Sequence, residues 1–174
     1  GDWWVGSYSG SDLHIKEGIY SGTTRLTIQD GTGNIGIGIT NPSVTLDVIG
    51  SIEYTGTITD VSDIRLKTNI IPLSNSLDKI IKLEGFTFEH KNKEKYGQVR
   101  EAGISAQALQ QVLPEAVSVI NDNGYLGVDY TQIIPLLIEG IKELRLENKK
   151  IQTENVDMKD MIYKLQKEVE SLKN

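Results

Sequence analysis

Residues 61–70 read VSDIRLKTNI, and the character of the chain changes at this stretch. The sequence before it is rich in glycine and alternates polar with apolar residues. The sequence after it has the pattern of a compact α/β segment that continues into a long heptad helix. We therefore predict an α+β chain in three parts: a β-rich part over 1–61, a small α/β domain over 62–133 and a helix over 134–174.

Short strands separated by glycine turns are predicted for the first part, which holds eleven of the seventeen glycines. The runs LHIK at 13–16 and TRLTI at 24–28 alternate as strands do. In GTGNIGIGI at 31–39, isoleucine recurs at every second position. Such a strand is expected to bury its isoleucine face, while its glycine face permits close backbone approach. Because the large apolar residues are too few for a core within one chain, we expect several identical chains to share it.

The second part is predicted to be a small α/β domain. A helix over 74–83 with a serine N-cap precedes a strand over 86–90, whose two phenylalanines should face the core. A charged loop at 91–97 leads to a strand at 102–105 and to a helix at 106–113, which Pro114 ends. A turn at 121–124, with glycine last, should close a second hairpin.

The third part has an apolar heptad repeat, which predicts a parallel coiled coil. Position a holds Ile134, Ile141, Asn148, Asn155, Ile162 and Val169, and position d holds Leu137, Leu144, Ile151, Met158, Leu165 and Leu172. The asparagines at a fix the register at a cost in stability. Isoleucine at a with leucine at d favours two strands, whereas the β-rich part favours three chains, so the heptads alone leave the number open.

Composition argues against several classes of protein. The net charge is -6, and residues 1–61 carry seven acids against Lys16 and Arg25, so a nucleic-acid partner is not expected. Thiolate chemistry is excluded because cysteine is absent. No apolar run approaches the length of a membrane span, and GDWW at 1–4 is unlike a signal peptide, so we expect a soluble protein made in the cytoplasm.

Cofactor and metal sites are not expected either. Gly31, Gly33 and Gly36 have the spacing of a dinucleotide-binding turn, but more alternation and a proline follow where that motif needs a helix. His14 and His90 are too far apart in the sequence to suggest a metal site.

Ser62 and Lys67 make a candidate catalytic pair, with Asp63 next to the serine. A serine hydroxyl becomes a good nucleophile when a base takes its proton, and a lysine is such a base when burial lowers its pKa toward neutrality. This pair would need no histidine. Its spacing alone is unspecific, because serine and lysine are common residues.

The stretch SDIRLKTNI at 62–70 resembles the opening motif of the intramolecular chaperone domains of phage tail spikes and fibres. This is the peptidase S74 or endosialidase-type family, which is also found in phage neck appendages and in myelin regulatory factor. The resemblance continues through SLDKI at 76–80, GISAQ at 103–107 and VDYTQIIPLLIE at 128–139, and it covers about residues 62–145.

The resemblance implies both an architecture and an activity. Such domains trimerise at the C-terminus of a fibre, guide the folding of an intertwined triple β-helix or related stalk, and then remove themselves by autoproteolysis. Ser62 matches the nucleophile of the family and Lys67 its general base, whereas Asp63 and Arg65 match positions to which we assign only positioning. The cut is expected at Ser62, on the side of Val61 or of Asp63.

The resemblance also implies partners and locations. The chain would form a homotrimer with two identical chains, and its own β-rich stalk over 1–61 would be the folding client. The stalk would belong to the virion and serve host adhesion, with a host receptor bound only by upstream parts. The chaperone part would act in the host cytoplasm. One alternative is a non-cleaving trimeric receptor-binding tip in which Ser62 and Lys67 are structural. The other is a membrane-associated coiled-coil adhesin.

Overall fold

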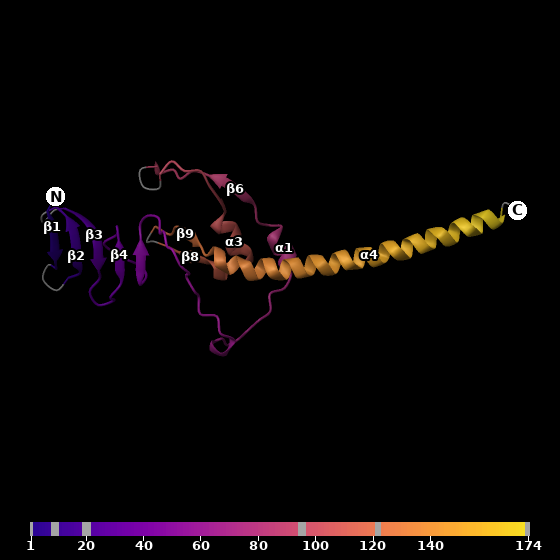
Figure 1. Cartoon of the computed structure of the whole chain (residues 1–174), viewed down its shortest axis with the longest axis horizontal. Helices are drawn as coiled ribbons and strands as arrows, with labels where there is room; N and C mark the ends of the chain where they lie inside the picture. Colours follow the sequence, from indigo (N-terminus) through magenta and orange to yellow (C-terminus); the bar gives the residue numbers. More distant parts are fainter. Residues whose placement is uncertain (1, 8–10, 19–21, 94–96, 121–122, 173–174) are drawn as a thin grey trace. The chain divides into compact units, whose positions relative to one another are not determined.

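A computed structural model describes residues 2–7, 11–18, 22–93, 97–120 and 123–172. The chain is mixed α+β, with small sheets and a long C-terminal helix (Figure 1), which confirms the predicted class at this level. It divides into two compact units. The first holds residues 1–67, 90–99 and 120–124, and the second holds 68–89, 100–119 and 125–174. An intertwined triple β-helix and a coiled coil with other chains stay predictions.

The first unit contains a five-stranded sheet whose strands follow one another in sequence order. The strands are β1 (Trp3–Gly6), β2 (Leu13–Glu17), β3 (Thr23–Ile28), β4 (Ile35–Ile37) and β5 (Leu46–Val48). Neighbours are antiparallel except β4 and β5, which are parallel. The predicted strand over 31–39 is shorter than expected, because Gly31 and Gly33 take positive φ angles of 77° and 72° in the turn before β4.

One face of this sheet is apolar and open. The ladder pairs align two apolar rows across the strands, namely Val5, Ile15, Leu26, Ile37 and Val48, and Leu13, Ile28, Ile35 and Leu46. Ile35 and Ile37 are 36% and 43% exposed in the single chain, so burial of the isoleucine face between several chains stays a prediction. The glycine between them is buried instead, and a Cβ atom on Gly36 would lie 2.4 Å from the carbonyl oxygen of Ile39.

The second unit contains two hairpins and short helices in the predicted order. These elements are α1 (Ser76–Ile80), β6 (Gly85–Phe88), β7 (Glu101–Ile104), α3 (Ala106–Val112), β8 (Val117–Val119) and β9 (Leu126–Val128). Strand β6 pairs with β7 and β8 with β9, both antiparallel. Gly124 has the positive φ that the second hairpin was expected to need, 74°. The rest of that predicted turn at 121–122, and residues 94–96 of the charged loop, lie outside the described residues.

The core of the second unit is formed by α3, the segment after it and the start of the C-terminal helix. Its buried residues are Leu109, Val112, Leu113, Ala116, Ile133 and Leu136. Phe86 is 44% exposed and Phe88 is partly buried, and their rings meet edge to face with centroids 6.1 Å apart. The prediction that both phenylalanines face the core is therefore wrong for Phe86, because β6 is a hairpin strand outside the helical core.

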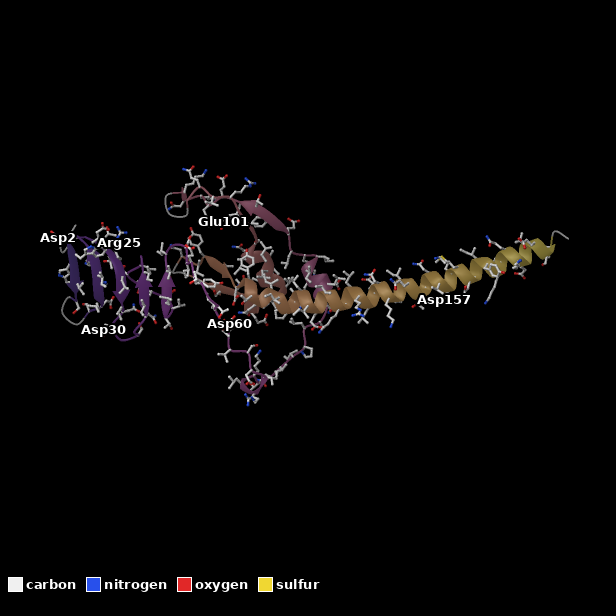
Figure 2. All side chains as sticks on the ribbon, in the orientation of Figure 1. Asp2, Arg25, Asp30, Asp60, Glu101 and Asp157 are labelled. Carbon is white, nitrogen blue, oxygen red and sulfur yellow. The ribbon has the colours of Figure 1, made fainter. Side chains whose placement is uncertain are left out.

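The C-terminal helix α4 (Ile133–Leu172) confirms the predicted long helix, and its 40 residues are roughly 60 Å long. Its first turns bury Ile133, Leu136 and Gly140. The neighbouring residues at heptad position a are not buried in this core, since Ile134 and Ile141 are 54% and 66% exposed. Every residue from 144 to 172 is exposed, and Figure 2 shows side chains above and below the helix near Asp157. Other parts of the described chain therefore do not cover the side chains at positions a and d.

Strand β9 is joined to α4 by η3 (Tyr130–Gln132), a single 3-10 turn. Asp129 caps this turn by accepting hydrogen bonds from the backbone N–H of Thr131 at 3.0 Å, from its hydroxyl at 2.7 Å and from the Gln132 amide at 3.0 Å. The Tyr130 hydroxyl accepts a hydrogen bond from the backbone N–H of Ile104 at 3.3 Å.

Among the described residues, no helix is long and apolar enough to cross a membrane.

Candidate functional site

The structure brings Ser62 and Lys67 together within one chain. The Lys67 ammonium donates a hydrogen bond to the Ser62 hydroxyl, with Nζ and Oγ 2.7 Å apart. Both side chains are exposed. A pair at this distance has the geometry that proton transfer between a hydroxyl and an amine requires. A lysine can act as a base only in its neutral form, which removal from water favours.

A short turn, η1 (Ile64–Leu66), produces this contact between residues five apart. Asp63 is its N-cap, and its carboxylate accepts a hydrogen bond from the Arg65 backbone N–H at 2.9 Å. The backbone N–H of Lys67 donates to the carbonyl of Ile64 at 3.1 Å, which closes the turn. The chain leaves the turn extended at Lys67. The sequence therefore places the lysine beside the serine through local hydrogen bonds alone.

Asp63 and Arg65 form an ion pair across the same turn. Arg65 Nε lies 3.0 Å and 3.1 Å from the two carboxylate oxygens, and its Nη2 lies 2.5 Å from Oδ2. The Arg65 side chain, and then its backbone N–H, hold the pKa of Asp63 below its ordinary value. The carboxylate in turn raises the pKa of Arg65. Both groups stay charged near neutral pH, so this pair is suited to holding the turn and not to moving protons.

The peptide bonds around Ser62 are accessible. Val61 is 82% exposed, and Ser62 is exposed as well. Residues 51–60, ahead of them, form no helix or strand. An irregular, exposed segment can change its conformation more readily than a helix or a strand.

Glu143 is a residue of interest that the sequence patterns missed. Its two carboxylate oxygens accept hydrogen bonds from the backbone N–H groups of Ser76, at 2.9 Å, and Leu77, at 2.7 Å. These N–H groups, Leu77 first, lower the pKa of Glu143. A serine was expected to cap this helix, but its N-cap is Asn75, which has a left-handed backbone and makes no side-chain cap hydrogen bond. The cap comes from a residue 67 positions further along, which only tertiary structure can reveal.

Metal and cofactor sites were not expected, and the described residues include no group of three or more histidine, cysteine, aspartate and glutamate side chains that could hold a metal ion. His14 Nδ1 lies 3.1 Å from the Thr27 hydroxyl, on the face of the sheet opposite the apolar rows. Gly31 and Gly33 lie in the turn between β3 and β4, where a strand and not a helix follows.

Comparison with known families identifies the segment that begins at Ser62. Residues 62–118 match the model of the peptidase S74 family, described as the chaperone of endosialidase. The resemblance inferred from the motifs is confirmed over this segment, and its first residue is Ser62. The chain therefore carries a peptidase S74 segment, preceded by glycine-rich strands and followed by a long helix.

Similar proteins include phage fibre proteins. The chain is 43% identical over 99 residues to the long tail fiber protein Gp37 of Enterobacteria phage K3 and equally similar to that of phage T2. The match covers 53% of this chain but 8% and 7% of those two proteins. Myelin gene regulatory factor-like A of Dictyostelium discoideum is 26% identical over 118 residues, which is 63% of this chain and 13% of that protein. The chain thus spans a small part of the length of these relatives.

Proposed function

We propose that this chain is the C-terminal intramolecular chaperone of a phage fibre or appendage protein, joined to the end of its stalk. Three chains assemble through it, their stalks fold, and each chain then cuts itself once at Ser62. The observation that carries the proposal is the 2.7 Å contact between Lys67 Nζ and Ser62 Oγ at the first residue of the family match. In this scheme residues 1–61 stay with the virion, and the rest is released in the host cytoplasm.

Two uncovered apolar surfaces support assembly with identical chains. The apolar rows of the sheet leave Val5 and Leu46 63% and 55% exposed. The heptad positions of α4 form a second surface, with Leu144 and Leu165 45% and 53% exposed. Contiguous apolar surface of this kind marks an interaction site. Three copies would cover both, since three sheets can enclose a common core and three helices a common coiled coil.

The proposed reaction is an N-to-O acyl shift followed by hydrolysis. Assembly removes water from the site, and neutral Lys67 takes the Ser62 hydroxyl proton. The Ser62 oxygen attacks the carbonyl carbon of Val61, and the peptide C–N bond breaks as Lys67 returns the proton to the leaving amine. Water then splits the ester, which yields a carboxylate at Val61 and a free amine at Ser62. A cut after Ser62 would instead need a serine from another chain, because Ser62 cannot attack its own carbonyl without forming a four-membered ring.

The first prediction is that purified wild-type protein runs as two fragments by mass, 1–61 and 62–174. Ser62→Ala should stay intact because the nucleophile is gone. Lys67→Arg should stay intact because arginine keeps the positive charge but cannot act as a base near neutral pH. Ser74→Ala and Lys82→Ala, which remove an exposed serine and an exposed lysine outside the site, should cut like wild type.

The outcome of this experiment decides between the proposal and the receptor-binding tip. A single intact band in wild type, or equal cutting in Ser62→Ala, would exclude self-cleavage at Ser62. Fragments that begin at Asp63 would place the cut after Ser62 and implicate a second chain. The Ser62→Ala and Lys67→Arg proteins should also be folded trimers by light scattering, since a monomer would refute the separation of assembly from cutting.

A further inference from the structure

Helix α1 is held against α4 by a small set of contacts within the second unit. Ser76 is fully buried at the start of α1, and the Glu143 carboxylate accepts hydrogen bonds from the first two N–H groups of that helix. One turn earlier on α4, Gly140 faces Ile80, and a Cβ atom on Gly140 would lie 2.4 Å from Ile80 Cδ1. The N–H groups at a helix start have no partner within the helix, so a buried start needs an acceptor from elsewhere.

This contact lies at the end of the segment that follows the proposed catalytic pair. Residues 68–75 connect Lys67 to α1 and form no helix or strand. Within that segment Ile70 and Ile71 are 59% and 83% exposed, whereas Leu73 packs against the core. Helix α1 is the first regular element after η1. The path of the chain beyond Lys67 is therefore fixed where Leu73 and α1 meet the rest of the unit.

On helix α4, the contact with α1 and the apolar heptad seam lie on different faces. Gly140 and Glu143 occupy positions g and c, whereas the apolar seam occupies a and d. The two faces lie roughly 110° apart around a helix of 3.6 residues per turn. Both are present on the same turns, since Ile141 is 66% exposed next to the buried Gly140. Partner helices can therefore occupy the seam without displacing α1.

We propose that Glu143 is a positioning residue for self-cleavage, which holds α1 on α4 and so fixes the chain segment that leaves Lys67. This role rests on the proposed function, because it concerns the reaction of Ser62. In this proposal the coiled coil orients α4, Glu143 and Gly140 orient α1, and α1 fixes the far end of residues 68–75, which follow Lys67 directly. Cleavage thereby depends on the assembled helix through a residue that never touches the reacting atoms.

The test measures the rate of self-cleavage of the full chain in variants of the contact between α1 and α4. Glu143→Ala removes both acceptors, and we expect cleavage to slow by roughly ten- to a hundredfold, the scale expected when reacting groups are misplaced by about 1 Å. Glu143→Gln keeps one acceptor oxygen and should fall between Ala and wild type. Glu139→Gln is the matched control, because Glu139 pairs with Lys142 one turn away and should leave the rate unchanged.

A second pair of variants tests the same contact without touching the carboxylate. Gly140→Ala should slow cleavage, because its Cβ atom pushes Ile80 and α1 away from α4. Gly140→Ala combined with Ile80→Val should restore the rate, since valine lacks the Cδ1 atom that the new methyl group meets. This rescue would not be expected if Gly140→Ala acted only by general loss of stability.

Oligomeric state, measured by light scattering, separates the possible outcomes. Slow cleavage in intact Glu143→Ala trimers, with rescue in the double variant, would support the proposal. Wild-type rates in Glu143→Ala and Gly140→Ala would overturn it while leaving self-cleavage in place. Loss of the trimer in Glu143→Ala would also overturn it, because Glu143 would then serve assembly. An uncut wild-type protein would overturn the proposed function itself.

Discussion

Three carboxylates in this chain each cap the start of a turn or helix. Asp63 caps η1, Asp129 caps η3 and Glu143 caps α1. Each of these carboxylates has a lowered pKa. The main cause is a hydrogen bond from the Arg65 side chain for Asp63 and one from the Thr131 side chain for Asp129. For Glu143 the main cause is the hydrogen bond from the Leu77 backbone N–H. Donors that point at a carboxylate favour its charged form. These caps should therefore weaken when acid protonates them.

The capping role of Asp129 predicts an acid-dependent loss of stability. Because its pKa is lower in the folded chain than the ordinary 3.8, its contribution is fully present above that value and is lost as the pH falls through the folded value. Asp129→Asn should be less stable than wild type at pH 6, and the difference should shrink below pH 3.8. Urea unfolding at several pH values checks this. A difference that stays constant down to pH 2 would contradict it.

The three caps also show what the sequence can predict at this scale. Asp63 and Asp129 accept hydrogen bonds from the backbone N–H groups two residues further along. Aspartate commonly makes this local contact, so a sequence pattern can predict it. The approach of Lys67 to Ser62 follows from such a local turn. Glu143 instead meets backbone groups 66 and 67 residues away. No spacing in the sequence indicates that contact, so the serine expected as the N-cap was the wrong candidate.

At the scale of elements, the first hairpin of the second unit is fitted closely to the turn before α4. The Tyr130 hydroxyl accepts the hydrogen bond from Ile104 at the end of β7, and a Cβ atom on Gly103 would lie 2.7 Å from that hydroxyl. It would also lie 3.1 Å from Phe88 Cε1. Glycine at this position therefore lets η3 and the hairpin approach each other. Periodicity predicted both strands of the hairpin but could not show this third partner.

The close approach at Gly103 predicts a substitution effect within one hairpin. Gly103→Ala should destabilise the unit by about 1–3 kcal/mol, the usual cost of overpacking, because Tyr130 or Phe88 has to move. Gly85→Ala is the matched control, since Gly85 pairs with Ile104 in the same hairpin and nothing lies within 4 Å of its Cβ position. Urea midpoints of the two variants give the comparison. Equal midpoints would show that Gly103 has more room than the structure indicates.

At the scale of the whole molecule, apolar residues occupy faces that one chain does not cover. Alternation and heptads predicted which residues share a face, and the sheet register and α4 agree. Burial of the isoleucine face was expected only in a core shared by several chains, and the single chain leaves that face exposed. Whether a face is inside depends on the number of chains present. That number is a property of the assembly and is absent from the periodicity of a single chain.

Two leucines on α4 test whether the heptad seam is an interface. Leu165 at position d and Leu146 at position f are 53% and 70% exposed in the single chain, so a monomer should tolerate lysine at either site. In a coiled coil, Leu165→Lys puts a charge into the seam and should convert trimers to monomers at micromolar concentrations. Leu146→Lys should leave the trimer intact. Light scattering distinguishes the two, and trimers in both variants would exclude α4 as the interface.

The two faces of α4 also restrict how its length can change. Inserting or deleting one residue between Glu143 and the next heptad would rotate everything beyond it by about 100°. The distal seam would then no longer be in phase with the face that carries α1. Seven residues restore the phase to within about 20°. In the proposed coiled coil, a change in helix length that keeps this phase comes in whole blocks such as a heptad, so the distance between the α/β unit and the end of the coiled coil would vary in steps.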